Sequence, residues 1–384
     1  MDAKAAARET IEDRRAALVD LSHRIHAHPE LAFEEEKASA WCAGFLADAG
    51  FAIEKPFCGL DTAFRARKGN GPLHVAFCAE YDALPSIGHA CGHNVIATMS
   101  LGAALAAARV ADEVGLTVTV VGTPAEEHGG GKILLLERGG FADEHLAMMA
   151  HPAPIDAEEF PSLACANLEV SYTGKAAHAA AFPQLGVNAL DALTVAQTAL
   201  GLLRQHIDPT DRLHGIVTHG GDAPNVVPAR TAARYLVRSQ TLGRLERLLP
   251  RVRNCFEAGA LATGAKLGFE ASKPYADMRQ DESLGALYRR NASELGRSFP
   301  ELGRSSAVSG STDMGNVSHA LPSIHPLIGL DSLPAVPHQP EFADCARTEV
   351  ADRAVFDGGL AMAWTAIDVA CDDALRERLL LRPR

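Results

Sequence analysis

The stretch that decides the fold runs from Leu73 to Asn94 and reads LHVAFCAEYDALPSIGHACGHN. Its first part, Leu73 to Ala79, is a largely apolar run of the kind that forms strands buried on both faces of a parallel sheet. The run leads into Glu80 and then into Cys91 and His93. In parallel sheets, ligands collect beyond the carboxyl ends of the strands. The stretch therefore predicts an α/β protein with a functional site at that edge of the sheet.

Two further apolar runs also end in polar side chains. Leu116 to Val121 (LTVTVV) precedes Glu126 and Glu127, and Leu146 to Ala150 (LAMMA) precedes His151. If these runs are parallel strands of the same sheet, a thiol, imidazoles and carboxylates converge beyond the carboxyl ends of its strands. That set of donors is typical of a transition-metal site. We therefore expect a metallohydrolase.

The sequence Cys91-Gly92-His93 has more than one interpretation. The glycine lets the backbone bend, so the thiol and the imidazole can turn towards one centre, and a thiolate can bridge two ions. A buried cysteine beside a helix-capping histidine is an alternative. A nucleophilic Cys/His pair is another, but it leaves the downstream carboxylates and imidazole without a role.

Glu126 and Glu127 are adjacent carboxylates that repel each other unless a cation or a proton neutralises part of the charge. Neighbouring side chains point in different directions, so one can bind metal while the other serves as a general base. A solvated surface pair is the alternative. His151, which we expect at the end of its strand, is a ligand candidate or a structural histidine.

Two later segments supply further candidates. The polar, turn-forming stretch Ser309 to Asn316 is typical of a pocket wall, and Ser311 and Thr312 within it are candidate substrate-binding residues. His325 and His338 both lie in proline-rich loops. Composition therefore leaves open which of them is the last metal ligand.

The sequence Gly129-Gly130-Gly131-Lys132 invites comparison with a phosphate-binding loop. In that motif the lysine is followed by Ser or Thr, and here it is followed by Ile133. The spacing of the glycines also differs from the motif. We therefore predict a tight turn before a helix over Ile133 to Arg138.

Composition limits the partners and the compartment. The formal charge of −12 argues against nucleic-acid and anionic-membrane partners, which need basic surfaces. No run of about eighteen uncharged apolar residues occurs, so no membrane span is expected. The charged N-terminus does not resemble a secretory signal, and the eight cysteines show no framework spacing. We expect a cytoplasmic protein with free thiols.

Length and element order predict two domains. At 384 residues the chain exceeds the usual size of a single core. Between Leu168 and Ala271 the periodicity predicts the order β-α-β-β-α-β, which is the ferredoxin-like arrangement. We therefore predict a discontinuous, mainly parallel α/β/α catalytic domain at 1–166 and 274–384. An inserted α+β lid or dimerisation domain would occupy 167–273.

Taken together, the motifs resemble those of a known family, the bimetallic amidohydrolases that include aminoacylase, glutamate carboxypeptidase, hippurate hydrolase and the auxin-conjugate hydrolases. The resemblance runs from the segment HPELAF at His28 to the segment HQPEF at His338. The segments EYDALP at Glu80 and GHACGHN at Gly88 are most similar to those of the aminoacylase-like dipeptidases and aminobenzoyl-glutamate hydrolases. One departure is Asn94, since the auxin-conjugate and hippurate hydrolases usually have an acidic residue there. The substrates of those two groups are therefore not transferred directly to this chain.

The resemblance implies a role for each candidate residue. It implies two divalent ions bridged by Cys91, with zinc favoured and manganese next. Glu127 and His338 would complete the shell of one ion, and His93 and His151 that of the other. The remaining implied roles are a general base at Glu126, a carboxylate at Asp82 that orients a ligand, an oxyanion-binding lid histidine at His178, and substrate-binding residues at Asn225 and Arg238.

We therefore expect a metal-dependent amidohydrolase that acts on an N-acyl amino acid or a small dipeptide-like molecule. A water activated by the metal would attack the carbonyl, with Glu126 as general base. A homodimer through the lid domain is expected, because ferredoxin-like sheets have open edges. Two alternatives remain, namely hydrolytic deamination or other C–N cleavage of a small aromatic or amidine substrate, and a non-catalytic binding protein.

Overall fold

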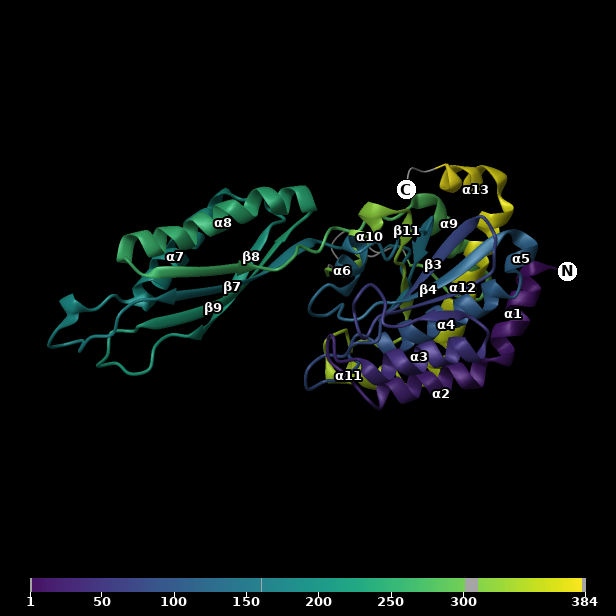
Figure 1. The fold of residues 1–384 in the computed structure, drawn as a ribbon, viewed down its shortest axis with the longest axis horizontal. Helices are drawn as coiled ribbons and strands as arrows, with labels where there is room; N and C mark the ends of the chain where they lie inside the picture. The colour runs from purple at the N-terminus through teal and green to yellow at the C-terminus, as the bar shows by residue number, and fades with distance from the viewer. Residues whose placement is uncertain (1, 160, 301–309, 382–384) are drawn as a thin grey trace. The chain divides into compact units, whose positions relative to one another are not determined.

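The computed structural model describes residues 2–159, 161–300 and 310–381, so Ser309 of the predicted pocket wall lies outside it. The chain forms two compact units (Figure 1). The first unit comprises Met1–Pro161 and Met278–Arg384, and the second comprises Ser162–Asp277. The predicted inserted segment, 167–273, falls inside the second unit.

A six-stranded sheet forms the centre of the first unit. Its strand order is β1-β2-β4-β3-β5-β11, and the pairs β4-β3, β3-β5 and β5-β11 are parallel. The sheet is thus mainly parallel, as predicted, with an antiparallel edge at β1 and β2. The bounds are β1 (Ala52–Glu54), β2 (Phe64–Lys68), β3 (Leu73–Ala79), β4 (Leu116–Gly122), β5 (Leu146–Met148) and β11 (Ser323–Ile324).

Helices cover both faces of this sheet, which explains why β3 is apolar almost throughout. Val75 and Phe77 pack in a core with the helices of one face, and Ala76 and Cys78 pack in a separate core on the other. The first face carries α1 (Ala3–Asp13), α2 (Arg15–His26), α3 (Glu36–Asp48), α4 (His93–Ala108) and α12 (Glu349–Cys371). The second carries α6 (Gly131–Glu137) and α10 (Met314–Ala320).

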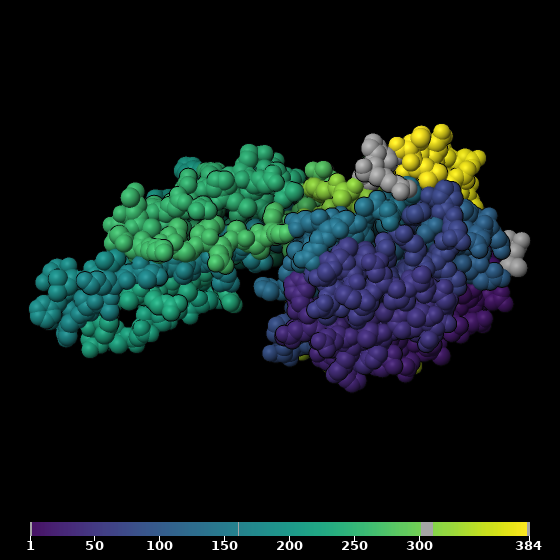
Figure 2. All heavy atoms as spheres, viewed as in Figure 1, coloured from purple at the N-terminus to yellow at the C-terminus, as the bar shows by residue number. Residues whose placement is uncertain are grey.

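The N-terminal helices and the remaining helices of this unit complete its outer layers, and α9 packs against α12. The N-terminal residues, purple to blue in Figure 2, form much of the surface of this unit in that view. The N-terminal helical segment is divided at Arg14 into α1 and α2. The other helices are α5 (Ala111–Val114), α9 (Glu282–Glu294), α11 (Pro340–Cys345) and α13 (Asp373–Leu380).

One helix in the described residues, α12, is long and apolar enough to cross a membrane by length and composition alone. However, 83% of its most apolar window is buried inside the protein. It packs against α4, α9 and α1, which is the position of a core helix.

The chain around His151 departs from the prediction. The strand expected from Leu146 to Ala150 ends at Met148, and His151 begins a different strand, β6 (His151–Ala153). This strand pairs in parallel with β12 (Leu327–Gly329) in a small two-stranded sheet. The apolar run continues beyond the end of β5 because Met149 and Ala150, which lie between the two strands, are also buried.

The second unit is a four-stranded antiparallel sheet with the order β10-β7-β9-β8. Its element order is β-α-β-β-α-β, so the predicted ferredoxin-like arrangement is confirmed. Two helices pack on one face around buried Tyr172 and Phe256. The bounds are β7 (Ala164–Thr173), η1 (Pro183–Leu185), α7 (Ala189–Leu203), η2 (Arg204–His206), β8 (Arg212–His219), β9 (Arg230–Ser239), α8 (Leu242–Thr263) and β10 (Lys266–Ala271).

Candidate metal centre

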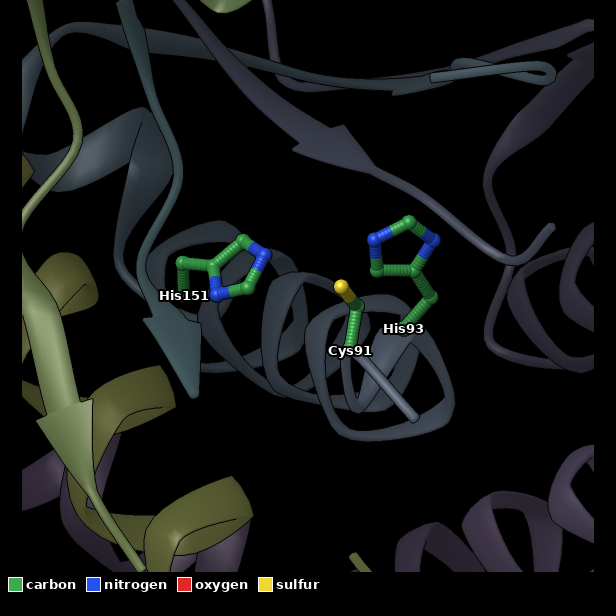
Figure 3. A group of neighbouring side chains, drawn as sticks. All are labelled: Cys91, His93 and His151. Atoms are coloured by element: carbon green, nitrogen blue, oxygen red, sulfur yellow. The ribbon is translucent and has the colours of Figure 1, made fainter. Parts of the chain in front are cut away.

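Cys91 and His93 lie on either side of a left-handed glycine at the start of α4. Gly92 has φ of +74°, and a Cβ there would lie 2.9 Å from Pro152 Cγ, so only glycine fits without strain. The resulting bend brings the ligand atoms of Cys91, His93 and His151 within 4.8 Å of one another. Figure 3 shows the Cys91 sulfur between the two imidazole rings.

Hydrogen bonds direct one nitrogen of each imidazole into the centre. His93 Nδ1 donates to the carboxylate of Asp82 at 3.0 Å and to its carbonyl oxygen at 2.9 Å. His151 Nδ1 donates to the carbonyl oxygen of Pro152 at 2.7 Å. In both rings Nε2 is therefore the nitrogen left to bind a metal.

Cys91 belongs to a second group of ligand atoms, formed with Glu127 and His338. His338 Nε2 lies 3.6 Å from Glu127 Oε2. The backbone N–H of His338 donates to the carbonyl oxygen of Ala90 at 3.0 Å, and His338 has the strained φ of +69°. Strain of this kind at a non-glycine residue is common at ligand-binding positions. Because the two groups share Cys91, they define two adjacent sites.

Polar atoms in these groups are buried without partners. His93 Nε2 and Glu127 Oε1 have no hydrogen-bond partner within the part of the chain that the structure describes. Burying such atoms unpaired costs about 1–3 kcal/mol each. Divalent cations bound by these atoms would remove that cost, and thiolate, imidazole and carboxylate are suitable donors for them. The residues present therefore fit a metal centre.

The ionisable ligands differ in their affinity for protons. Burial, followed by the nearby imidazoles of His325 and His93, lowers the pKa of His151 to about 3. Burial also lowers the pKa of His93, but the carboxylate of Asp82 outweighs it and raises this pKa well above its usual range. Burial raises the pKa of the Cys91 thiol. A metal must therefore displace protons from Cys91 and His93, but not from His151.

Asp82 connects the two strand-end loops of the centre. One carboxylate oxygen accepts from His93, and the other accepts from the backbone N–H of Glu127 at 2.9 Å. Asp82 is 1% exposed, so its orientation is set by these bonds and not by solvent. It can hold a ligand from each group in place, in keeping with its predicted orienting role.

Glu126 lies beside Glu127 and is 7% exposed. Its carboxylate is within 4.8 Å of the ligand atoms of His93 and Glu127. Burial, then the charges of Glu80 and Glu127, raises the pKa of Glu126 well above its usual range. A carboxyl group with a raised pKa in a metal site is suited to take and return a proton near neutral pH.

A buried charge network next to Glu126 was not predicted. Lys132 is fully buried, and its ammonium contacts both Glu80 and, at 2.7 Å, Asp313. Its backbone N–H also donates to Asp313 at 2.9 Å. The glycines before Lys132 make the turn possible, because a Cβ on Gly131 would lie 1.8 Å from the carbonyl oxygen of Pro124. The only sequence signal was a lysine at the start of the apolar segment ILLL.

Other predicted residues of the first unit lie around the centre. His325 is buried and stacks on His151, with ring centroids 5.5 Å apart, but it belongs to neither group of ligand atoms. Thr312 is buried, and its hydroxyl accepts from the backbone N–H of Met314 at the start of α10, whereas Ser311 is partly exposed. Their substrate contacts remain predictions.

Asn94 is the position at which the chain differs from the auxin-conjugate and hippurate hydrolases. Its side chain points away from the ligand groups. Its side-chain amide donates to Ser22 Oγ at 2.9 Å and to the carbonyl oxygen of Ala346 at 2.8 Å. The residue thus links α4 to α2 and to the end of α11. The difference at this position concerns helix packing, so it is a poor guide to the substrate.

The remaining predicted residues lie in the second unit. His178 and Asn225 are exposed and occupy adjacent loops, joined by a hydrogen bond from Ala179 N–H to the carbonyl oxygen of Asn225 at 3.0 Å. His178 Nδ1 accepts from the backbone N–H of Ala181 at 3.2 Å, so its Nε2 carries the proton and is a donor. Arg238 lies on β9, on the face opposite to the helices.

Comparison with known proteins identifies the family. Residues 76–351 match the family described as Peptidase family M20/M25/M40. The chain is 40% identical to the Xaa-Arg dipeptidase of Mus musculus over 97% of this chain and 90% of that protein. It is 34% identical to one of the subunits of p-aminobenzoyl-glutamate hydrolase from Escherichia coli (strain K12), over 66% of this chain and 57% of that protein.

Solved structures agree with this assignment at the level of the fold. The YXEP protein of Bacillus subtilis, described as a dinuclear metal-binding peptidase from the M20 family, superposes with a TM-score of 0.71 at 20% identity. The match covers 94% of this chain and 99% of that one. The resemblance noted from the motifs is confirmed, and the chain belongs to peptidase family M20/M25/M40.

Proposed function

We propose that this metallohydrolase cleaves the amide bond of a dipeptide or an N-acyl amino acid at a centre of two divalent ions. The observation that carries the proposal is the sharing of Cys91 between two groups of ligand atoms. His93 and His151 would hold one ion, and Glu127 and His338 the other. Thiolate and imidazole donors favour zinc, with manganese next.

The ions, when bound, would polarise the scissile carbonyl and lower the pKa of the attacking water. Glu126 would take a proton from that water and deliver it to the amine as the C–N bond breaks. Asp82 would keep His93 and the backbone of Glu127 oriented throughout. The division of roles is supported by the environments of the two glutamates, since Glu127 belongs to a group with Cys91 and His338 and Glu126 does not.

The second unit would act as a lid that contributes substrate contacts. His178 would donate its Nε2–H to the developing oxyanion. Asn225, on the adjacent loop, and Arg238 would bind the substrate, with the guanidinium reading its carboxylate. The exposure of His178 and Asn225 supports a role that is completed only when other groups approach.

A C₂ homodimer through the second unit is also proposed. Strand β8 is at the edge of its sheet, so one row of its backbone groups faces away from the other strands. Ile216 and Val217 on this strand are 64% and 44% exposed, which is unusual for β-branched apolar side chains. Pairing of two such edges would cover both the outward-facing backbone groups of β8 and the exposed side chains of Ile216 and Val217.

Dipeptides with a C-terminal arginine are the first substrates to test, because a relative that is 40% identical is named for them. A suitable panel adds Xaa-Gln dipeptides, N-acetyl amino acids and p-aminobenzoyl-glutamate, each with zinc-loaded and chelator-treated protein. The expected result is metal-dependent release of the free amino acid. Release of ammonia without amide cleavage would instead favour the C–N hydrolase alternative. Failure of fully loaded protein to cleave any amide would contradict the proposal.

A further inference from the structure

The loop between α2 and α3 contacts both of the loops that carry the metal centre. The carbonyl oxygen of Glu30 accepts from the backbone N–H of Ala83, next to Asp82, at 2.8 Å. The ring of Phe33 lies against Gly129, where a Cβ would come within 2.4 Å of Phe33 Cε2. This segment was recognised as a sequence motif, yet none of its residues belongs to either group of ligand atoms. Its contacts point to a different role.

Glu35 makes the most specific of these contacts. Its Oε1 accepts from the backbone N–H of Ala125 at 2.8 Å, and Glu35 is fully buried. Glu35 stands at the N-cap position of α3, but its side chain does not cap the helix. The carboxylate of Glu30 does so instead, accepting from Lys37 N–H and from Ala38 N–H. The carboxylate of Glu35 is therefore available to hold a loop from elsewhere in the chain.

The loop that Glu35 contacts has a strained backbone at Ala125, the residue that donates the hydrogen bond. Ala125 has φ of +60°, a left-handed conformation that costs an alanine about 1–2 kcal/mol. The next two residues are Glu126 and Glu127, so the conformation of Ala125 determines the direction in which the chain presents them. Burying a carboxyl group is itself costly, since burial and then the charge of Asp82 raise the pKa of Glu35 to about 7. A residue needed only to fill space would not require a buried hydrogen-bond acceptor here.

We propose that Glu35 is a positioning residue, whose carboxylate fixes Ala125 in its left-handed conformation and thereby directs Glu126 and Glu127 to their separate places in the centre. The inference rests on the proposed function for the role of Glu126. Its effect on Glu127 concerns metal binding and can be measured without any substrate.

Three variants of the full chain test this inference. In Glu35→Gln the amide oxygen still accepts from Ala125, so metal affinity and kcat stay within a few-fold of the wild type. In Glu35→Leu the acceptor is lost, and zinc affinity and kcat each fall about 10- to 100-fold, as expected for an outer partner of a metal site, while KM changes little. Glu35→Asp withdraws the carboxylate by one methylene and shows a smaller loss of the same kind. Zinc affinity is measured by competition with a chromophoric chelator.

Glu144→Leu is the matched control. Glu144 is also buried and accepts from Arg67 at 2.8 Å. However, it precedes β5, so it lies at the amino ends of the parallel strands, whereas the metal centre lies at their carboxyl ends. We expect this control to lose stability but to keep zinc affinity and kcat. Wild-type affinity and kcat in both Glu35→Leu and Glu35→Asp would overturn the inference, as would equal losses in Glu144→Leu. If Glu35→Leu does not fold, the comparison of Glu35→Asp with Glu35→Gln decides. Absence of turnover in the wild type contradicts the proposed function. The zinc affinities of the Glu35 variants still test the positioning role of Glu35 in that case.

Discussion

The candidate functional groups of the two units are held in different ways. In the first unit most of them are buried, with His338 as an exposed exception, and other side chains orient them, as Asp82 does for His93 and Lys132 does for Glu80. In the second unit His178 and Asn225 lie on exposed loops fixed by backbone hydrogen bonds. The first arrangement is preorganised and costly to disturb. The second is typical of loops that complete a site only when a ligand or partner arrives.

The largest effect is expected from the buried pair of glutamates. Glu126→Gln should retain metal but lose activity by about 10²- to 10⁴-fold, the usual contribution of a general base. Glu127→Gln should instead lower the zinc content measured by elemental analysis. Equal loss of metal in both variants, or full turnover by Glu126→Gln, would contradict the separate roles.

For the exposed loops, His178→Ala should lower kcat by about 10²- to 10³-fold, the value of an oxyanion donor, with metal content unchanged. If His178 acts across a dimer, mixing this variant with Glu126→Gln should restore partial activity through hybrid dimers. Subunit exchange shown by mass spectrometry, with no activity recovered, would exclude action between subunits.

The preorganised centre should depend strongly on Lys132. Lys132→Met leaves the buried carboxylates of Glu80 and Asp313 without their counter-charge, and should lower the free energy of unfolding by about 3–5 kcal/mol. Lys37→Met, at an exposed position, is the matched control and should be nearly neutral. Chemical denaturation measures both. A loss below about 1 kcal/mol for Lys132→Met would mean that the network is not needed to hold these charges.

A smaller effect concerns pH. The raised pKa values of Cys91 and His93 mean that both are protonated near neutral pH in the metal-free protein, whereas His151 is not. Binding should therefore release protons from Cys91 and His93, and zinc affinity should rise with pH. Calorimetry in buffers of different ionisation enthalpy counts the protons, and Cys91→Ala should release about one fewer. Affinity that is constant from about pH 6 to 8 would show that neither group competes with the metal.

The same contrast explains what could be predicted from the sequence. Leu73 to Ala79 was predicted as a strand with the bounds observed for β3, because burial on both faces leaves a continuous apolar run. The family membership confirms the predicted metal-dependent hydrolase. The candidate ligands were recognisable because each lies just beyond an apolar run or in a recognised motif.

The supporting residues could not be found in this way. Lys132 contacts partners 52 and 181 residues away, and Glu35 contacts Ala125 at a separation of 90 residues. Neither residue has a local pattern that distinguishes it from an exposed lysine or a helix-capping glutamate. The change of sheet at His151 is not visible in the sequence, because the buried residues Met149 and Ala150 continue the apolar run of β5 up to the start of β6.

The central claim is that Cys91 joins two ion sites in one preorganised centre. Anomalous diffraction from zinc-loaded crystals tests it most directly. Two peaks about 3.5–4 Å apart are expected, with the Cys91 sulfur about 2.3 Å from both zinc ions. A single peak, or a Cys91 sulfur in contact with only one ion, would contradict it.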